Sequence, residues 1–156
     1  MPKESQIKAA FIYNFTKFVE WPAARFSEPD SPIMIGVFGK SPVALQLPEA
    51  IKDRKVNGRG IVFKPIERIA DAKSVHLLFV SAAADDQVIE VLNSMKGSSV
   101  LTIGESEAFA KAGGMINFVR EGDKVRFEIN ADSAEQADLK ISAQLQKLAK
   151  SVRRKS

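Results

Sequence analysis

The stretch VHLLFVSAAADDQVIEVLNSM, residues 75–95, has the pattern of a buried strand followed by a helix. Residues 76–80 are almost uniformly apolar, which is typical of a strand covered on both faces of a sheet. The acidic pair Asp85-Asp86 follows and favours the start of a helix. Apolar residues then recur at helical spacing: Val88, Ile89, Leu92 and Met95. The stretch is therefore one strand–helix unit.

Similar alternation runs through the rest of the chain. Further strands are predicted at residues 33–38, 61–66, 100–103, 115–119 and 124–130. Helices are predicted at residues 5–19, 43–47 and 105–112, and from about residue 132 onward. Because apolar central strands alternate with helices, the pattern favours a mostly parallel sheet with helices on both faces.

The two ends of the chain are predicted to be helical. The N-terminal stripe consists of Ile7, Ala10, Phe11, Phe15 and Phe18. Pro22 should end this helix and leave Trp21 extended, as a packing hinge. A long C-terminal helix is predicted by the apolar positions Ala134, Ala137, Ile141, Leu145, Leu148 and Val152.

Strand 124–130 alternates in polarity. Val125, Phe127 and Ile129 should face the core, while Arg126, Glu128 and Asn130 should face solvent. We therefore expect it to form an antiparallel hairpin at the edge of the sheet. The predicted fold is an α/β/α three-layer sandwich with a sheet of about six strands, and we expect residues 1–156 to form one domain.

Composition narrows the function classes. Apolar residues make up 45% of the 156 residues and charged residues 27%, as in ordinary globular domains. The absence of cysteine excludes disulfides and thiolate chemistry. No apolar run reaches the roughly 18–20 residues of a membrane-spanning helix, so we expect no membrane insertion.

The net charge of +4 raises the question of nucleic-acid binding. The cations form two modest groups, Lys52, Arg54, Lys55 and Arg59, and Lys147, Lys150, Arg153, Arg154 and Lys155. The second group is best explained as the solvated end of a helix, where cations complement the helix dipole. We therefore expect no nucleic-acid partner.

The glycine-containing segments do not have the spacing of known nucleotide-binding motifs. Residues 39–41, Gly-Lys-Ser, follow a strand as in a phosphate-binding loop, but Met34 stands where the first glycine is required. Gly113-Gly114 follows a helix rather than a strand, so it is better explained as a helix stop and a tight turn. No dinucleotide-binding fingerprint is present, and we predict no cofactor.

Catalytic groups are sparse. His76 is the only histidine, and no serine lies in a nucleophile-elbow motif, so we interpret His76 as structural. One histidine without cysteine also argues against a metal site. Asp85, Asp86, Glu105 and Glu107 stand near the expected carboxyl ends of strands, where α/β sheets bind ligands, although helix starts favour acidic residues in any case.

The run KAAFIYNFTKFVEWP, residues 8–22, resembles the start of the mature YfiR-like proteins. Further blocks in the family's order are VFG (37–39) with SP (41–42), VHLLFVS (75–81), VLTI (100–103), Phe109 with GGMINF (113–118), VRFEIN (125–130) and LKISAQL (139–145). The resemblance covers residues 7–150.

This resemblance implies a periplasmic regulator without enzyme activity, whose signal peptide has been removed. Such a protein represses an inner-membrane diguanylate cyclase by binding its periplasmic sensor part, and so lowers cyclic di-GMP and biofilm formation. The resemblance also implies release by an outer-membrane lipoprotein and a homodimeric state. Cysteines that permit redox control in some relatives are absent here, near Ala110 and Asn117.

We expect the partner to bind at Arg126, Glu128 and Asn130, which strand alternation places on one polar face. Ordinary solvation, with Asn130 capping the next helix, explains the same residues equally well. The alternative function is a periplasmic small-molecule sensor or enzyme that uses the carboxyl edge of the sheet. A deep, closed cavity with convergent polar groups there would favour that alternative.

Overall fold

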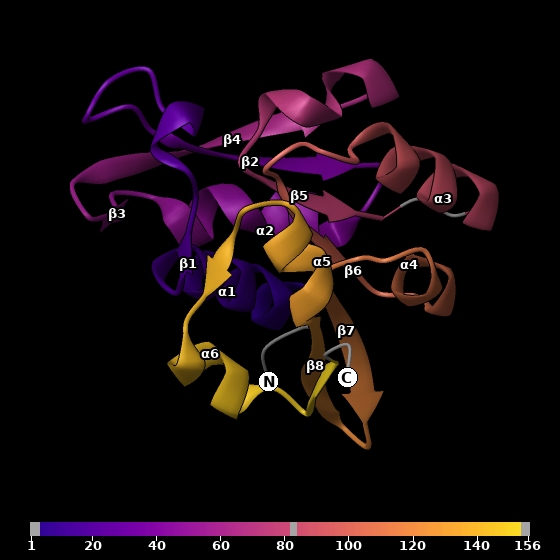
Figure 1. Ribbon diagram of the computed structural model, residues 1–156. Helices are drawn as coiled ribbons and strands as arrows, with labels where there is room; N and C mark the ends of the chain where they lie inside the picture. The colour runs from indigo at the N-terminus through magenta and orange to yellow at the C-terminus, as the bar shows by residue number, and fades with distance from the viewer. Residues whose placement is uncertain (1–3, 82–83, 154–156) are drawn as a thin grey trace.

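An eight-stranded, mostly parallel sheet forms the centre of the computed structural model, which describes residues 4–81 and 84–153 (Figure 1). Its strands lie in the order β10-β8-β7-β6-β5-β2-β4-β3. In chain order they are β2 (Ile33–Phe38), β3 (Lys55–Val56), β4 (Arg59–Ile66), β5 (Leu77–Val80), β6 (Leu101–Gly104), β7 (Ile116–Glu121), β8 (Lys124–Asn130) and β10 (Ser151–Arg153). The β3–β4 and β7–β8 pairs are antiparallel and the others parallel, which confirms the predicted mixed sheet.

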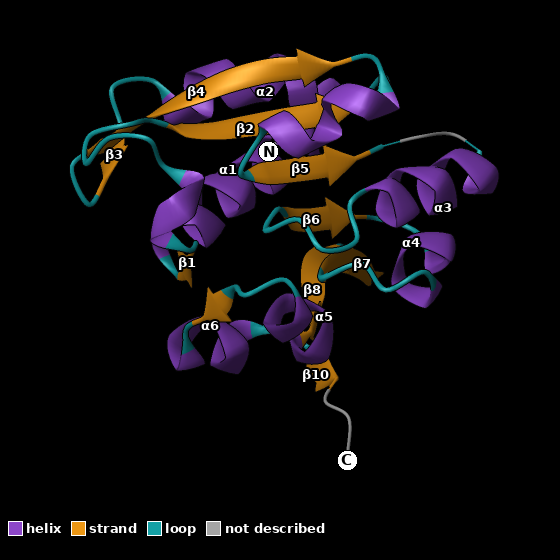
Figure 2. Ribbon diagram, turned by 45° about the horizontal axis from the view of Figure 1, so that its top comes forward, coloured by secondary structure: helices purple, strands orange, loops and turns teal. Residues whose placement is uncertain are grey.

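Helices cover both faces of this sheet (Figure 2). One face packs against α1 (Glu4–Lys17) and α2 (Pro42–Ile51). The other packs against the 3₁₀ helix η2 (Ile69–Ser74), α3 (Asp85–Ser94) and α4 (Glu107–Lys111). The predicted three-layer α/β/α arrangement is therefore confirmed.

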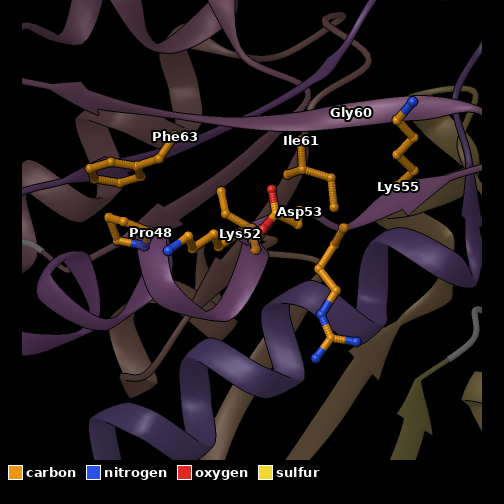
Figure 3. A pocket seen from close by; sticks show the side chains of 9 residues that line it. Pro48, Lys52, Asp53, Lys55, Gly60, Ile61 and Phe63 are labelled. Carbon is orange, nitrogen blue, oxygen red and sulfur yellow. The ribbon is translucent and has the colours of Figure 1, made fainter.

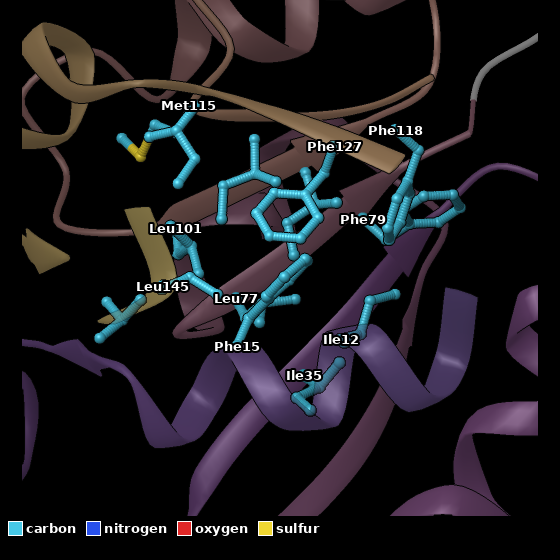
Figure 4. Close-up of a cluster of buried hydrophobic side chains, with 14 of the residues drawn as sticks. Ile12, Phe15, Ile35, Leu77, Phe79, Leu101, Met115, Phe118, Phe127 and Leu145 are labelled. Atoms are coloured by element: carbon cyan, nitrogen blue, oxygen red, sulfur yellow. The ribbon is translucent and has the colours of Figure 1, made fainter. Parts of the chain in front are cut away.

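Strand alternation divides the core between these two faces. Leu77 and Phe79 of β5 belong to the cluster under α1 and α2, whereas Leu78 and Val80 belong to the cluster under η2 and α3. Figure 4 shows the first cluster, in which Phe15 of α1 meets the aromatic rings of the β7–β8 hairpin. Both faces of the central strands are thus apolar because both are covered.

In the second cluster, Phe109 lies against two glycines. A Cβ atom on either Gly104 or Gly114 would collide with the Phe109 ring. Gly113 has φ +95 and ends the turn after α4, as predicted from the helix stop. The Gly-Gly pair therefore combines a turn with a close approach of backbone to ring.

The buried face of α1 differs from the predicted stripe. Phe15 is fully buried, but Ala10 is exposed, while Ala9 and Ile12 are fully buried. The reason is that α1 packs both on the sheet and against α2, which lies beside it, so residues on two sides of the helix contact apolar neighbours. Lys8 is also buried, as a charged residue on a helix that contributes to the core.

The prediction of one long C-terminal helix is wrong. Residues 131–153 form α5 (Ala131–Gln136), β9 (Lys140–Ile141), α6 (Ala143–Leu148) and β10. Helix α5 ends because Asp138 adopts φ 61 and the Leu139 N–H donates to the Ala134 carbonyl, a left-handed helix stop. Ser142 then begins α6, since its hydroxyl accepts a hydrogen bond from the Leu145 N–H.

The prediction that strand 124–130 lies at the edge of the sheet is also wrong. β10 pairs in parallel with β8, with Ser151 opposite Glu128 and Arg153 opposite Asn130. β9 pairs with β1 (Val19–Glu20) in a separate two-stranded sheet, which holds the segment after α1. Among the described residues, no helix is both long and apolar enough to cross a membrane.

Candidate partner-binding surface

The three residues predicted to bind a partner lie along β8, between β7 and β10. Across these strands Glu128 is flanked by Asn117 on β7 and Ser151 on β10. The apolar residues of β8, Phe127 and Ile129, are buried, and Arg126, Glu128 and Asn130 are half-buried. The predicted alternation is present, but β10 covers part of the polar side.

Glu128 and Asn130 share a cleft of about 70 Å³. Its other lining residues are Ala110, Gly114, Met115, Asn117, Ile129, Ser151 and Arg153. A Glu128 carboxylate oxygen accepts a hydrogen bond from the Ser151 hydroxyl at 3.0 Å. The cleft is too small for more than a side chain or a few waters, so it suits a contact point on a protein surface.

Arg126 lies outside this cleft. Its guanidinium is 3.7 Å from a Glu121 carboxylate oxygen, and the Lys150 ammonium is 3.2 Å from the other oxygen of Glu121. These exposed ion pairs contribute little stability each. They place positive and negative side chains next to each other near the β7–β8 turn, on the same side of the sheet edge as Glu128.

Asn130 has a structural role as well. Its side-chain oxygen accepts a hydrogen bond from the Ser133 N–H at 3.1 Å and so caps α5. The predicted capping by Asn130 is therefore confirmed. A substitution at Asn130 would disturb α5 together with any partner contact, which makes Glu128 the cleaner position to test.

Ala110 and Asn117 line the same cleft. The Asn117 side-chain oxygen accepts a hydrogen bond from the Ser106 N–H at 3.1 Å. In this chain an amide therefore fastens the start of α4 to β7.

The carboxyl edge of the sheet, where the alternative small-molecule site was expected, carries a charged cluster. The Lys8 ammonium lies 3.0 Å from a Glu4 carboxylate oxygen and 2.5 Å from a Glu105 carboxylate oxygen. Arg120 pairs with the second oxygen of Glu4 at 2.8 Å. These residues line a depression of about 450 Å³, but their charges are matched by one another. The cluster therefore fastens α1 to β6 and β7 rather than presenting free groups to a ligand.

The cluster shifts two pKa values. Burial alone would lower the pKa of Lys8, but its hydrogen bonds to Glu105 and Glu4 outweigh burial and raise it. The pKa of Glu4 is lowered, chiefly by its hydrogen bond with Lys8, against the opposing effect of burial. Both shifts favour the charged forms. Lys8 was not predicted as a functional or core residue, because its partner Glu105 is 97 positions away.

The other acidic candidates do not converge with this cluster. Asp85 and Asp86 are exposed in the first turn of α3, and Glu107 is exposed in the first turn of α4. Such positions complement the helix dipole. Within residues 4–81 and 84–153, no group of three His, Cys, Asp or Glu side chains is arranged to hold a metal ion.

His76 is buried and fastens the segment around the 3₁₀ helix η1 (Ala23–Arg25). Its Nδ1 accepts a hydrogen bond from the Met34 N–H at 2.9 Å, so Nε2 carries the proton and donates to the Arg25 carbonyl at 3.0 Å. Its ring stacks on Phe26 with centroids 4.5 Å apart. Both ring nitrogens of His76 therefore form hydrogen bonds to the backbone, which agrees with the prediction that His76 is a structural residue.

Comparisons with known proteins identify the family of the chain and show similar folds. No curated protein matches the chain. A solved structure of a conserved domain protein from Vibrio cholerae O1 biovar El Tor strain N16961 is similar, with 12% identity and a TM-score of 0.61. The match covers 96% of this chain and 60% of that one, so this chain spans about 60% of its length.

A second similar structure is an ABC domain from Streptococcus pneumonia, solved in complex with L-Trp. It has 14% identity and a TM-score of 0.53, covering 78% of this chain and 55% of that one. Both likenesses show the fold alone. The family model described as YfiR/HmsC-like (DUF4154) matches residues 5–150. The chain therefore belongs to the YfiR/HmsC-like family.

Proposed function

We propose that this chain is a non-catalytic periplasmic regulator that represses an inner-membrane diguanylate cyclase by binding its periplasmic sensor part. Repression would lower cyclic di-GMP and biofilm formation. The observation that carries the proposal is the family match, which extends over residues 5–150 and therefore over almost the whole chain.

We further propose that the partner binds on the β8 surface, defined by Arg126, Glu128 and Asn130. Residues of both charge signs stand there on strands rather than loops, because β7, β8 and β10 are hydrogen-bonded neighbours. A rigid scaffold of this kind loses little conformational entropy when a partner binds. Glu128 is the middle residue of the three and lines the small cleft beside β8.

The first test is capture of a tagged full-length chain from periplasm and solubilised inner membrane of its own organism. We expect a diguanylate cyclase to be recovered, and we expect deletion of the gene to raise cellular cyclic di-GMP. Repression should return with the wild-type gene. Recovery of no cyclase, together with unchanged cyclic di-GMP in the deletion strain, would refute the proposal.

The second test places the partner contact. Glu128→Lys should keep the fold, with a change in unfolding free energy of about 0.5 kcal/mol, as is usual for surface positions. It should nevertheless weaken repression, because charge reversal in a complementary interface costs several kcal/mol of binding. Ser151→Ala is the matched control, since it removes the same hydrogen bond without reversing a charge. Normal repression by Glu128→Lys would place the interface elsewhere.

Two finer parts of the proposal concern assembly. We propose that the chain forms a homodimer and that an outer-membrane lipoprotein relieves repression. Light scattering during gel filtration measures the first directly, with a monomer mass at micromolar concentration as the opposing result. Co-purification of a lipoprotein from outer-membrane extract tests the second.

A further inference from the structure

The sheet has a second edge, at β4, on the far side from the β8 surface. β3 pairs only with Arg59 and Gly60. On its inner side β4 pairs with β2 from Ile61 to Ile66. Among the strands of the described residues, none pairs with the outer side of residues 61–66. This part of β4 is therefore an open strand edge.

The direction of the backbone groups on this edge follows from two observations. The Met34 and Phe38 carbonyls of β2 accept hydrogen bonds from His76 and Ser81 on the β5 side, so the odd-numbered residues of β2 face β4. In the parallel register, the even-numbered residues of β4 then pair with β2. Pro65, which has no N–H, occupies an outward position, as a proline in a strand requires. The N–H and C=O of Phe63 therefore point outward.

A groove of about 510 Å³ runs beside this edge, between β4 and the end of α2 (Figure 3). Figure 3 shows Phe63 and Ile61 of β4 and Pro48 of α2 around it, with Lys52 and Lys55 projecting beside them. The groove thus joins an apolar surface to three cationic side chains, Lys52, Arg54 and Lys55, and to one carboxylate, that of Asp53.

The charge around the groove is positive. Residues 49–64 contain five cations and two carboxylates: Lys52, Arg54, Lys55, Arg59 and Lys64 against Glu49 and Asp53. Three of the cations have partners, since Arg54 and Arg59 lie over the Tyr13 and Phe26 rings and Lys64 donates to Ser74. Lys52 and Lys55 are exposed, and neither forms an ion pair or hydrogen bond within the described part of the chain. They are therefore available to an anionic partner.

We propose that this groove binds an extended acidic segment of a partner protein, which adds a strand to the open edge of β4. Its main chain would pair with Phe63, and its carboxylates would meet Lys52 and Lys55. The site goes beyond the proposed function, because four strands, β7, β6, β5 and β2, separate β4 from β8 and its proposed partner contact.

Two other occupants fit the groove less well. Edge-to-edge pairing with a second copy of this chain would bring the same lysines of both copies together, which opposes association. An anionic membrane would complement the lysines, but it offers no main chain to pair with the outward N–H and C=O of Phe63. An acidic strand satisfies both the charges and the backbone groups.

The probe is a fluorescein-labelled peptide of about eight residues, a common strand length, with glutamate and valine alternating. Two counterparts carry lysine for glutamate, or proline for valine. We expect the full-length chain to bind the acidic peptide, with affinity falling as salt is raised, and to bind neither counterpart. Equal binding of the proline peptide would overturn strand addition, and equal binding of the lysine peptide would overturn the charge argument.

The double variant Lys52→Glu/Lys55→Glu should weaken peptide binding by about tenfold or more, because both contacts become repulsive. Lys96→Glu/Lys111→Glu is the matched control, since both lysines are exposed near α3 and α4 on the other face. Glu128→Lys should also bind the peptide normally. Loss of peptide binding therefore tests the β4 groove alone, and loss of repression tests the β8 surface alone. Circular dichroism confirms that each variant is folded.

Amide hydrogen exchange locates the bound strand. The Phe63 amide should become protected when peptide is added, whereas the Val62 amide, which pairs with β2, is protected already. Unchanged exchange at Phe63 would overturn the proposed pairing. If vesicles of phosphatidylglycerol and phosphatidylcholine bind through Lys52 and Lys55 while the peptide does not, the groove is a membrane site. A dimer that dissociates in the double variant would assign it to a second copy.

Discussion

At the scale of single residues, Phe15 is the aromatic anchor of α1. Its ring is fully buried and lies 5.0 Å from the Phe127 ring and 5.9 Å from the Phe118 ring, centroid to centroid. Phe15→Ala should therefore lower the unfolding free energy by about 3–5 kcal/mol, measured by denaturant titration. Phe11→Ala is the control and should cost less, because Phe11 is only partly buried. An unchanged midpoint for Phe15→Ala would show that the aromatic stripe does not anchor the helix.

His76 should make stability depend on pH in the mildly acidic range. Burial lowers its pKa below the ordinary 6.5, and the charges of Arg25 and Arg59 add to that effect, against the opposing hydrogen bond to the Arg25 carbonyl. The unfolded chain therefore binds the proton more readily than the folded chain. Stability from His76 is complete above about pH 6.5 and falls below it, by at most about 1.4 kcal/mol per pH unit.

The measurement is urea unfolding at a series of pH values between 7.5 and 5. His76→Gln should be less stable than the wild type at pH 7.5, because the stacking on Phe26 is reduced. Its stability should also change less with pH in this range. An identical pH slope in His76→Gln would mean that another group controls the acid sensitivity.

The burial and role of single residues were predicted correctly where they depend on neighbouring positions in the sequence. The alternation of 125–130 correctly separated Phe127 and Ile129 from the polar side chains, and the Asn130 cap followed from its position before a helix. Lys8 was missed because a lysine near a helix start is ordinarily exposed. Only the fold brings Glu105 to it.

At the scale of elements, the Glu4–Lys8–Glu105 cluster fastens α1 to the carboxyl edge of the sheet. Removing the ammonium by Lys8→Met leaves the Glu105 carboxylate without an ion pair among the described residues, while Glu4 keeps only its ion pair with Arg120. This should cost about 1–3 kcal/mol at pH 7. Chemical denaturation measures the loss. Lys111→Met is the control, because Lys111 is exposed at the end of α4 and should tolerate the change.

The same cluster should also contribute to acid unfolding. The lowered pKa of Glu4 means that its stabilisation is present above about pH 4.5 and is lost as pH falls through the folded-state value. The raised pKa of Lys8 has the opposite sense, so its stabilisation is lost only as pH rises through its folded-state value, above 10.5. In Lys8→Met the loss of stability below pH 4.5 should be shallower. An equally steep loss would show that Glu4 does not depend on Lys8.

All six strands expected from apolar runs or alternation are present, because each run is long enough to show its period. The two- and three-residue strands β1, β3, β9 and β10 were not predictable, since two or three residues have no periodicity and pair only through tertiary contacts. The apolar residues of the C-terminal segment recur at helical spacing through both α5 and α6, so the sequence resembles one long helix. No glycine or proline at Asp138 indicates that the first helix ends there.

At the scale of the whole molecule, the sheet order explains why two surfaces can act separately. The β8 surface and the β4 groove lie near opposite ends of the sheet, with β7, β6, β5 and β2 between them. The outer position of β10 was not predicted, and it changes the β8 surface from an exposed edge to a partly covered one. Arg154 and Lys155 of the second basic group lie outside the described residues.

The sheet order also predicts how the molecule unfolds. The only tryptophan, Trp21, donates its indole N–H to the His76 carbonyl at 2.7 Å, and so reports on the junction between the segment after α1 and the start of β5. Because core residues from both ends of the chain share the cluster under α1 and α2, we expect residues 1–156 to unfold as one domain. Tryptophan fluorescence and far-ultraviolet circular dichroism should therefore give coincident urea transitions. A fluorescence change that precedes the loss of circular dichroism would show that the α1 junction opens independently of the sheet.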